Sequence, residues 1–259
     1  MDVGYFGPDS VTWRIHAEPV AMVGGLRALL LQALHPGAMR LLAERSDFRA
    51  DPWSRFQRTT GYVATVCFAP TSEVDAAAAR VRAVHRALGI DDPEQLAWVH
   101  ACLVDSFLVA ARAAGIRLSA AERDRYVREQ MRAGRLVGVA DPPADVRALR
   151  GFVDSVRPVL AGTDEARDAA RLVVAPPLPV PRRFVLPARL GWTTISTLAV
   201  GLLPGWARAL YRLPPLPGAA VTTAVGMRTL RRAVHVLPEQ YREGPMYRAA
   251  KARVAALAH

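Results

Sequence analysis

The spacing of apolar and polar residues along the chain predicts a protein made almost entirely of helices. Apolar residues recur every three to four positions in most segments, and no alternating segment is long enough to require a strand. Alanine, leucine, arginine and valine dominate the composition, so helix propensity is high. We expect one all-α domain, a multi-helix bundle over residues 1–259. Its main helices are expected at about 26–43, 54–67, 71–88, 92–114, 119–133, 145–161, 165–174, 190–203, 219–234 and 245–257.

Helix breakers and capping residues set the expected helix ends. Gly24-Gly25 is expected to break a short first helix, and Pro36-Gly37 to break the next one after His35. Asp92-Pro93 has the pattern of an N-cap followed by proline at the first helical position. The pattern Ser119–Glu122 predicts a capping box at the start of a charged helix.

Two stretches in the second half of the chain differ from the rest. Residues 176–187 contain five prolines and are expected to form a rigid, non-helical crossing. Residues 190–203 carry no charge but include several hydroxyl side chains, which favours a buried or interfacial helix over a membrane-spanning one. Peripheral membrane contact through this helix is therefore an expectation.

The formal net charge of +11 does not by itself indicate nucleic-acid binding. Lys251 is the only lysine, and the arginines are dispersed from Arg14 to Arg253 without a basic run that is interleaved with aromatic residues. We expect no nucleic-acid partner. A basic surface does favour contact with anionic lipid or an acidic partner.

The two cysteines indicate a reducing compartment. Cys67 and Cys102 both lie in apolar runs, so we expect buried thiols rather than a disulfide. The N-terminus is acidic and polar and lacks the pattern of a secretory signal. The expected localisation is cytoplasmic, with membrane association as the additional expectation stated above.

Familiar enzyme motifs are absent from the sequence. It contains no glycine-rich dinucleotide or P-loop motif, no His-Glu-x-x-His, no Gly-x-Ser-x-Gly and no paired Cys-x-x-Cys. Any chemistry must therefore depend on histidine, arginine and hydroxyl side chains.

Three histidines are candidates for such chemistry. His85 and His100 have apolar residues at helical spacing, so both are expected to face inward, and His35 lies where a helix breaks. An inward histidine can bind haem iron. Spacing alone favours the ordinary alternative, a core histidine whose ring is satisfied by the backbone. Asp105-Ser106, about one turn after His100, is expected to bond to it or to its neighbours.

Arg55 and Thr59 lie four residues apart and so share one helix face, with Arg58 on the adjoining ridge. A guanidinium can pair with a haem propionate, and a threonine hydroxyl can donate to bound dioxygen. Spacing alone again favours the simpler alternative, a solvated arginine pair with Asp51 as its partner.

Several motifs resemble the oxygenases named for the mycophenolic-acid pathway enzyme (MpaB-type) and for the rubber-cleaving latex clearing protein. The resemblance spans essentially the whole chain and is most specific over residues 6–107. The matching pieces are Phe6-Gly7-Pro8-Asp9-Ser10-Val11-Thr12-Trp13, Ala28-Leu29-Leu30-Leu31-Gln32-Ala33-Leu34-His35-Pro36, Ser46-Asp47-Phe48, Asp51-Pro52, Arg55-x-x-Arg58-Thr59, Val81-Arg82-x-x-His85, Trp98-Val99-His100-Ala101, Leu237-Pro238 and Tyr247-Arg248-x-Ala250.

The resemblance implies a multi-helix bundle, globin-like in character, that encloses a haem b pocket. His85 best matches the histidine that binds the iron, and Arg55 and Thr59 match residues close to the haem, with Arg58 replacing a lysine. In the hypothesis built on this resemblance, His35 and His100 border the distal pocket, although His100 has no firm place in the pattern of the rubber-cleaving branch. No acid in this chain matches the catalytic glutamate of the rubber-cleaving branch, which argues against polymer cleavage.

The resulting expectation is a haem b-dependent oxygenase or oxidoreductase that acts on a small apolar or lipid-like substrate with dioxygen. The expected iron ligand is His85, and the expected catalytic residues are Arg55, Thr59 and His100. The cofactor-binding set is His85, Arg55, Arg58, Thr59 and His35. Two alternatives stay open: a haem or lipid carrier without turnover, and a non-haem iron enzyme that uses His35, His85 and His100.

Overall fold

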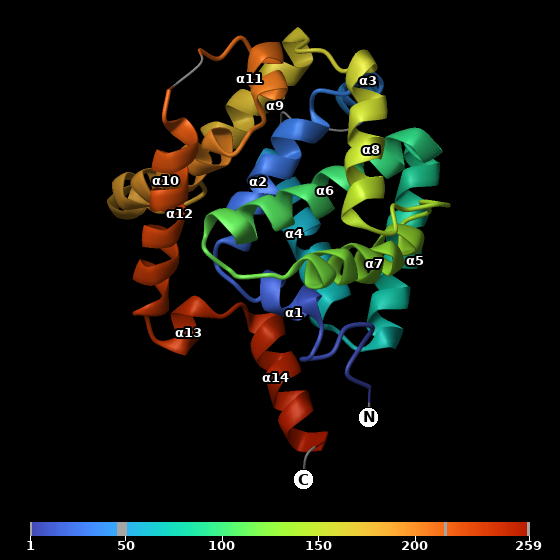
Figure 1. Ribbon diagram of the computed structural model, residues 1–259, viewed down its shortest axis with the longest axis vertical. Coiled ribbons are helices and arrows are strands. Elements are labelled where there is room, and N and C mark those ends of the chain that lie inside the picture. The colour runs from blue at the N-terminus through green and yellow to red at the C-terminus, as the bar shows by residue number, and fades with distance from the viewer. Residues whose placement is uncertain (1, 46–50, 215–216, 258–259) are drawn as a thin grey trace.

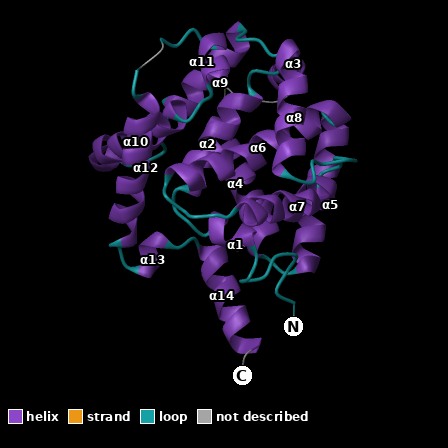
Figure 2. Cartoon of the chain, viewed as in Figure 1, coloured by secondary structure: helices purple, strands orange, loops and turns teal. Residues whose placement is uncertain are grey.

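The computed structural model describes residues 2–45, 51–214 and 217–257. Within these ranges it consists of helices joined by loops and turns (Figures 1 and 2). No strand occurs among them, so the all-α prediction is confirmed. The α-helices are α1 (Val11–His16), α2 (Ala21–Gln32), α3 (Pro36–Arg45), α4 (Pro52–Phe68), α5 (Thr71–Leu88), α6 (Pro93–Ala113), α7 (Ala120–Leu136), α8 (Val146–Val156), α9 (Asp164–Val174), α10 (Val185–Gly201), α11 (Gly205–Leu210), α12 (Ala219–His235), α13 (Glu239–Arg242) and α14 (Pro245–Leu257). Two short 3₁₀ helices, η1 (Arg157–Val159) and η2 (Arg182–Phe184), join them.

Helices α2 and α6 form the centre of the molecule and pack against each other more extensively than any other pair of described helices. Their contact depends on Gly24, because a Cβ there would lie 3.0 Å from Cδ1 of Phe107 and 3.2 Å from the carbonyl oxygen of Ser106. The prediction that Gly24-Gly25 breaks the first helix is wrong. The chain turns earlier, between α1 and α2, and this glycine lets two helices approach closely.

Helix α6 is long and apolar enough to cross a membrane by composition alone, but half of its apolar segment is buried inside the protein. Its buried residues include Trp98, Cys102 and Phe107. The core between α2, α6 and their neighbours explains this apolar character without a membrane. Both cysteines are free and buried, as predicted.

A buried arginine ties three helices together. Nη1 of Arg27 on α2 donates to Oδ2 of Asp105 at 2.8 Å and to Oγ of Ser106 at 2.7 Å, both on α6. Its Nε donates to the carbonyl oxygen of Leu202, at the end of α10, at 2.9 Å. The side chains of Asp105 and Ser106 are expected from the sequence to bond to His100 or its neighbours, and they instead compensate the charge of Arg27 on α2.

Most helix ends follow the local signals. Asp92 caps α6, and Ser119 and Glu122 form the predicted capping box of α7. Helix α5 stops at Gly89, which has a positive φ of 62°. Helix α4 begins at Pro52, earlier than the expected start near residue 54. Its N-cap is Asp51, whose carboxylate accepts from the backbone N–H of Ser54 at 3.1 Å.

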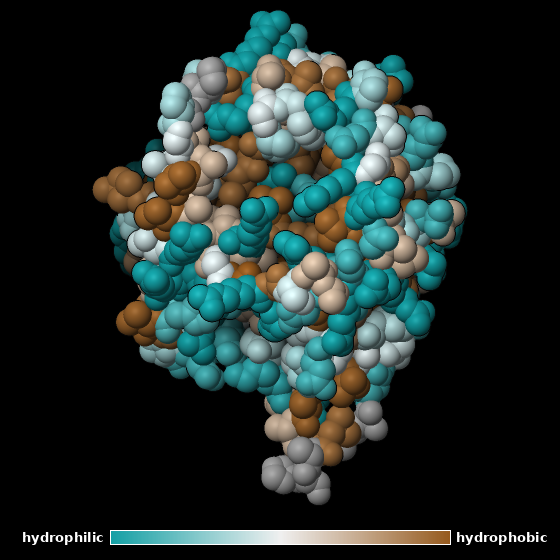
Figure 3. Space-filling view, viewed as in Figure 1, coloured by the Kyte–Doolittle hydropathy of each residue, from teal (hydrophilic) through white to brown (hydrophobic). Residues whose placement is uncertain are grey.

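The proline-rich stretch is only partly non-helical. Helix η2 and the first turn of α10 occupy its second half, so that part of the prediction is wrong. Helix α10 buries only Ser196 and Ala199 and leaves Leu186 and Leu190 exposed at 69% and 63%. Hydrophobic side chains project at the left edge of the molecule, over the start of α10 (Figure 3). The helix is thus apolar on its outer side as well as its inner side, and it lies at the surface.

Candidate functional site

A cavity of about 540 Å³ lies between α2, α4, α5, α6, α7 and α9, and it is the best candidate for a functional site. Its walls are largely apolar. A smaller group of polar side chains faces it: His16, Gln32, Arg55, Arg58, Thr59, Tyr62, Arg80, His85, Gln95, His100 and Gln130.

One face of α4 supplies several of these polar groups. Arg55, Thr59 and Tyr62 recur at helical spacing on this face, and Arg58 lies beside them. The hydroxyl of Thr59 donates to the carbonyl oxygen of Arg55 at 3.0 Å, so its lone pairs remain available to a ligand in the cavity. The predicted shared face of Arg55 and Thr59 is present in the structure.

The two arginines concentrate positive charge on the α4 wall. The pKa of Arg55 is lowered from its ordinary value, first by burial and second by the nearby charge of Arg58. Two neighbouring guanidinium groups form a favourable environment for an anionic group, because a bound anion would offset their mutual repulsion.

His85 lines the cavity from the last turn of α5, together with Val81 and Val84. The imidazole Nδ1 is buried and has no hydrogen-bond partner among the described residues. Burial, followed by the charge of Arg55, lowers the pKa of His85, so the ring is neutral at pH 7. A neutral imidazole with an unsatisfied nitrogen is suited to bind a metal.

Tyr62 is a site residue that sequence reasoning treated only as an apolar helix position. Its hydroxyl is buried and has no hydrogen-bond partner in the described part of the chain, and burial raises the pKa of Tyr62 to about 12. The available signal was its position three residues after Thr59, on the same face. Tyr62 therefore presents a neutral hydroxyl group at the cavity wall.

His100 lines the cavity from α6 and is buried, as predicted. Burial lowers the pKa of His100 to about 4, and a hydrogen bond to the backbone of Gln130 partly opposes this shift. The ring packs directly on α7, where a Cβ at Gly134 would lie 2.9 Å from its Cδ2 and Nε2 atoms. His100 is thus a neutral imidazole held between α6 and α7.

His16 also faces the cavity, although its sequence context was weak. Its Nε2 lies 3.0 Å from the hydroxyl oxygen of Tyr126, and its ring packs 4.3 Å from that of Phe107. Burial lowers the pKa of His16 to about 3. No local pattern signals this position, because α1 is short and only the tertiary packing directs His16 inward.

His35 has a different place in the structure. Its Nδ1 accepts a hydrogen bond from the backbone N–H of Ala38 at 3.2 Å, which satisfies a free donor at the start of α3. Among the described residues, His35 is not one of those that line the cavity. A role beside a cofactor stays a prediction for this residue.

The described residues contain no group of three or more His, Cys, Asp or Glu side chains that could hold a metal ion. The non-haem alternative requires His35, His85 and His100 to converge on one ion. The site instead offers single histidines in a largely apolar cavity. One histidine is enough for a metal that a porphyrin already holds.

A family model described as "ER-bound oxygenase mpaB/B'/Rubber oxygenase, catalytic domain" matches residues 13–236. This range includes every cavity residue discussed above. No curated protein and no solved structure matches the chain.

Proposed function

The chain belongs to the family of mpaB-type oxygenases and rubber oxygenases, and from this premise we propose that it is a haem b-dependent oxygenase acting on a small apolar substrate. One observation carries the proposal. His85 lines a largely apolar cavity, and its ring is neutral. The buried Nδ1 of this ring has no hydrogen-bond partner among the described residues.

The cavity residues fit the chemical requirements of haem b. The macrocycle needs apolar walls, its iron needs a neutral imidazole, and its propionates need cationic partners. His85 would hold the iron, and Arg55 and Arg58 would pair with the propionates. When bound, the haem would supply an iron centre that activates dioxygen.

The remaining polar residues would orient the reactants. We assign Thr59 and His100 to the catalytic set together with Arg55, because all three face the cavity. Thr59 would accept a hydrogen bond at its Oγ1, and His100, which is neutral at pH 7, would donate or accept a hydrogen bond at its ring. Tyr62 adds a neutral hydroxyl donor to the same set.

The substrate we propose is apolar because aromatic rings form part of the cavity wall. Trp53, Phe56 and Trp192 lie with ring centroids 5.5 to 5.7 Å apart and all line the cavity. The indole Nε1 of Trp192 donates to the carbonyl oxygen of Val173 at 3.0 Å, so this ring offers its carbon surface to a ligand.

Trp192 also connects the cavity with the exposed face of α10. Leu186 and Leu190 project from that face, and Arg182, Arg183 and Arg189 flank them. Exposed apolar residues beside arginines favour an anionic lipid surface. We propose that the protein touches membranes at this face and takes apolar substrate from them.

Absorption spectroscopy of the purified protein supplied with haem tests the cofactor. We expect a Soret band for the unaltered chain and loss or a clear shift of this band for His85→Ala. The matched control is His235→Ala, because His235 is exposed and bonds to Glu18 outside the cavity. A spectrum without a Soret band, or one unchanged by His85→Ala, would refute the assignment.

Oxygen consumption separates an enzyme from a carrier. With reconstituted protein and candidate apolar substrates, an oxygenase consumes dioxygen in proportion to product, whereas a haem or lipid carrier binds without turnover. Haem binding with no substrate-dependent oxygen uptake would support the carrier alternative.

A further inference from the structure

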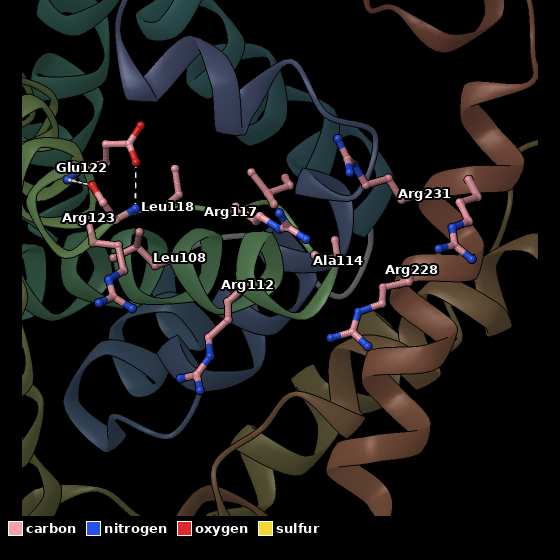
Figure 4. A pocket seen from close by; sticks show the side chains of 13 residues that line it. Leu108, Arg112, Ala114, Arg117, Leu118, Glu122, Arg123, Arg228 and Arg231 are labelled. Atoms are coloured by element: carbon pink, nitrogen blue, oxygen red, sulfur yellow. Dashed lines mark hydrogen bonds between the residues drawn. The ribbon is translucent and has the colours of Figure 1, made fainter.

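A second hollow, of about 740 Å³, lies outside the cavity described above (Figure 4). It is bounded by the end of α6, the loop from α6 to α7, the start of α7, and α12. None of its lining residues belongs to the cavity. Six arginines line it: Arg112, Arg117, Arg123, Arg228, Arg231 and Arg232.

Acidic side chains compensate little of this charge. Arg231 is paired with Glu18 through bonds of 2.6 and 2.9 Å. Among the described residues that line the hollow, Glu122 is the only acid. Its carboxylate contacts Nη1 of Arg14 at 2.5 Å and accepts from the backbone N–H of Ser119 at 2.7 Å, so it is already occupied. Within the described ranges, the guanidinium groups of the other five arginines form no salt bridge or side-chain hydrogen bond.

Several arginines elsewhere in the chain have acidic neighbours. On α9, Arg167 and Arg171 each pair with an aspartate three residues earlier, at 2.8 and 2.5 Å. Arg157 pairs with Asp154 in the same way. Five of the six arginines that line the hollow lack an acidic partner of this kind within the described ranges. Like charges gathered in one concave surface repel each other, and a bound anion would relieve that repulsion.

The hollow also contains apolar surface. Leu108, Ile116 and Leu118 line it beside the arginines. The chain reverses at Gly115, which has a φ of +79°, and the side chain of Arg228 lies across it, with Cγ and Nε each 3.6 Å from the position a Cβ would take. The close-up shows Arg112 and Arg228 extending from opposite sides, α6 and α12 (Figure 4).

We propose that this hollow binds a small molecule that carries phosphate. A guanidinium matches the geometry of phosphate oxygens through paired N–H donors, and several guanidinium groups suit more than one negative charge. The volume lies in the range of small-molecule pockets, which favours a compact ligand over a macromolecule. The apolar surface would take the carbon portion of an organic phosphate.

Titration calorimetry at constant ionic strength tests this proposal on the full chain. The probes are inorganic pyrophosphate, which offers charge alone, and hexyl phosphate, which adds an apolar chain. We expect 1:1 binding of at least one probe and about a tenfold or greater loss of affinity in Arg112→Gln/Arg228→Gln, because two charge-assisted contacts are removed. The control is Arg147→Gln/Arg150→Gln, which removes the same charge from two exposed positions on α8.

The outcomes are distinct. Tighter binding of hexyl phosphate identifies an organic phosphate, and tighter binding of pyrophosphate identifies a free polyphosphate; both support the site. Failure of both probes to bind, or equal weakening in the two double variants, would overturn it. Circular dichroism shows whether each variant is folded, and all four arginines are exposed.

Discussion

At the scale of single residues, the environment of each histidine determines its chemistry. His85 has a buried ring nitrogen that no described residue pairs with, whereas His35 is bonded at the start of α3 and His16 lies against a tyrosine hydroxyl. An unsatisfied buried polar group lowers stability unless a ligand completes it. For this reason His85 is the histidine on which we base the proposed haem site.

Gly134 controls the position of His100. We expect Gly134→Ala to displace the His100 ring or the α7 backbone, because the new Cβ would lie 2.9 Å from two ring atoms. The expected loss is about 1–3 kcal/mol in the free energy of unfolding, as for other overpacked cores. Urea denaturation followed by circular dichroism measures it.

The control for this substitution is Gly151→Ala on α8. No atom lies within 4 Å of a Cβ at that position, and alanine favours helix by about 0.5–1 kcal/mol over glycine. The control variant should be equally stable or more stable. If Gly134→Ala is as stable as the control, the close packing of His100 on α7 is refuted.

At the scale of elements, α10 combines two roles. Its inner side packs on α2, α9 and α12 and brings Trp192 to the cavity, while its outer side exposes leucines. A surface helix in a soluble assembly ordinarily presents polar residues outward. The exposed leucines of α10 are the reason we propose this helix as the membrane contact.

We expect Leu186→Gln/Leu190→Gln to weaken binding to anionic vesicles, because both side chains are more than 60% exposed and would enter the lipid interface. Flotation with vesicles that contain phosphatidylserine measures the bound fraction. The matched control, Val236→Gln/Leu237→Gln, alters two exposed apolar residues after α12 and should bind like the unaltered chain. Equal flotation of both variants would exclude α10 as the contact.

At the scale of the whole molecule, buried neutral histidines make stability depend on pH. The pKa values of His16 and His100 are lowered from 6.5 to about 3 and about 4, while the unfolded chain titrates near 6.5. Between these values the unfolded state binds protons that the folded state does not. The free energy of unfolding therefore falls as the pH falls below about 6.5.

The expected decrease is about 2 kcal/mol for each of these histidines between pH 6.5 and 5, at roughly 1.4 kcal/mol per pH unit. Urea denaturation across this range measures it. We expect His100→Gln to give a shallower pH dependence than the unaltered chain, because one of the two histidines with strongly lowered pKa values is removed. An unchanged slope in this variant would show that His100 is not buried and neutral.

Much of the helical framework follows from interactions within a few residues, and the sequence alone determined it. Asp92, Ser119 and Gly89 end or begin helices through local capping and backbone conformation, so their patterns predicted the boundaries. The shared face of Arg55 and Thr59 is likewise a property of one helix and was predictable from their spacing.

Only the tertiary structure decided which helix faces pack against each other. Gly24 continues a helix instead of breaking it because α6 packs against it, and Asp105 bonds to Arg27 because α2 brings that charge into the core. His16 reaches the cavity, and Arg112 and Arg228 line one hollow, through packing between segments more than ninety residues apart. Such contacts depend on long-range packing, whose free energy no local pattern encodes.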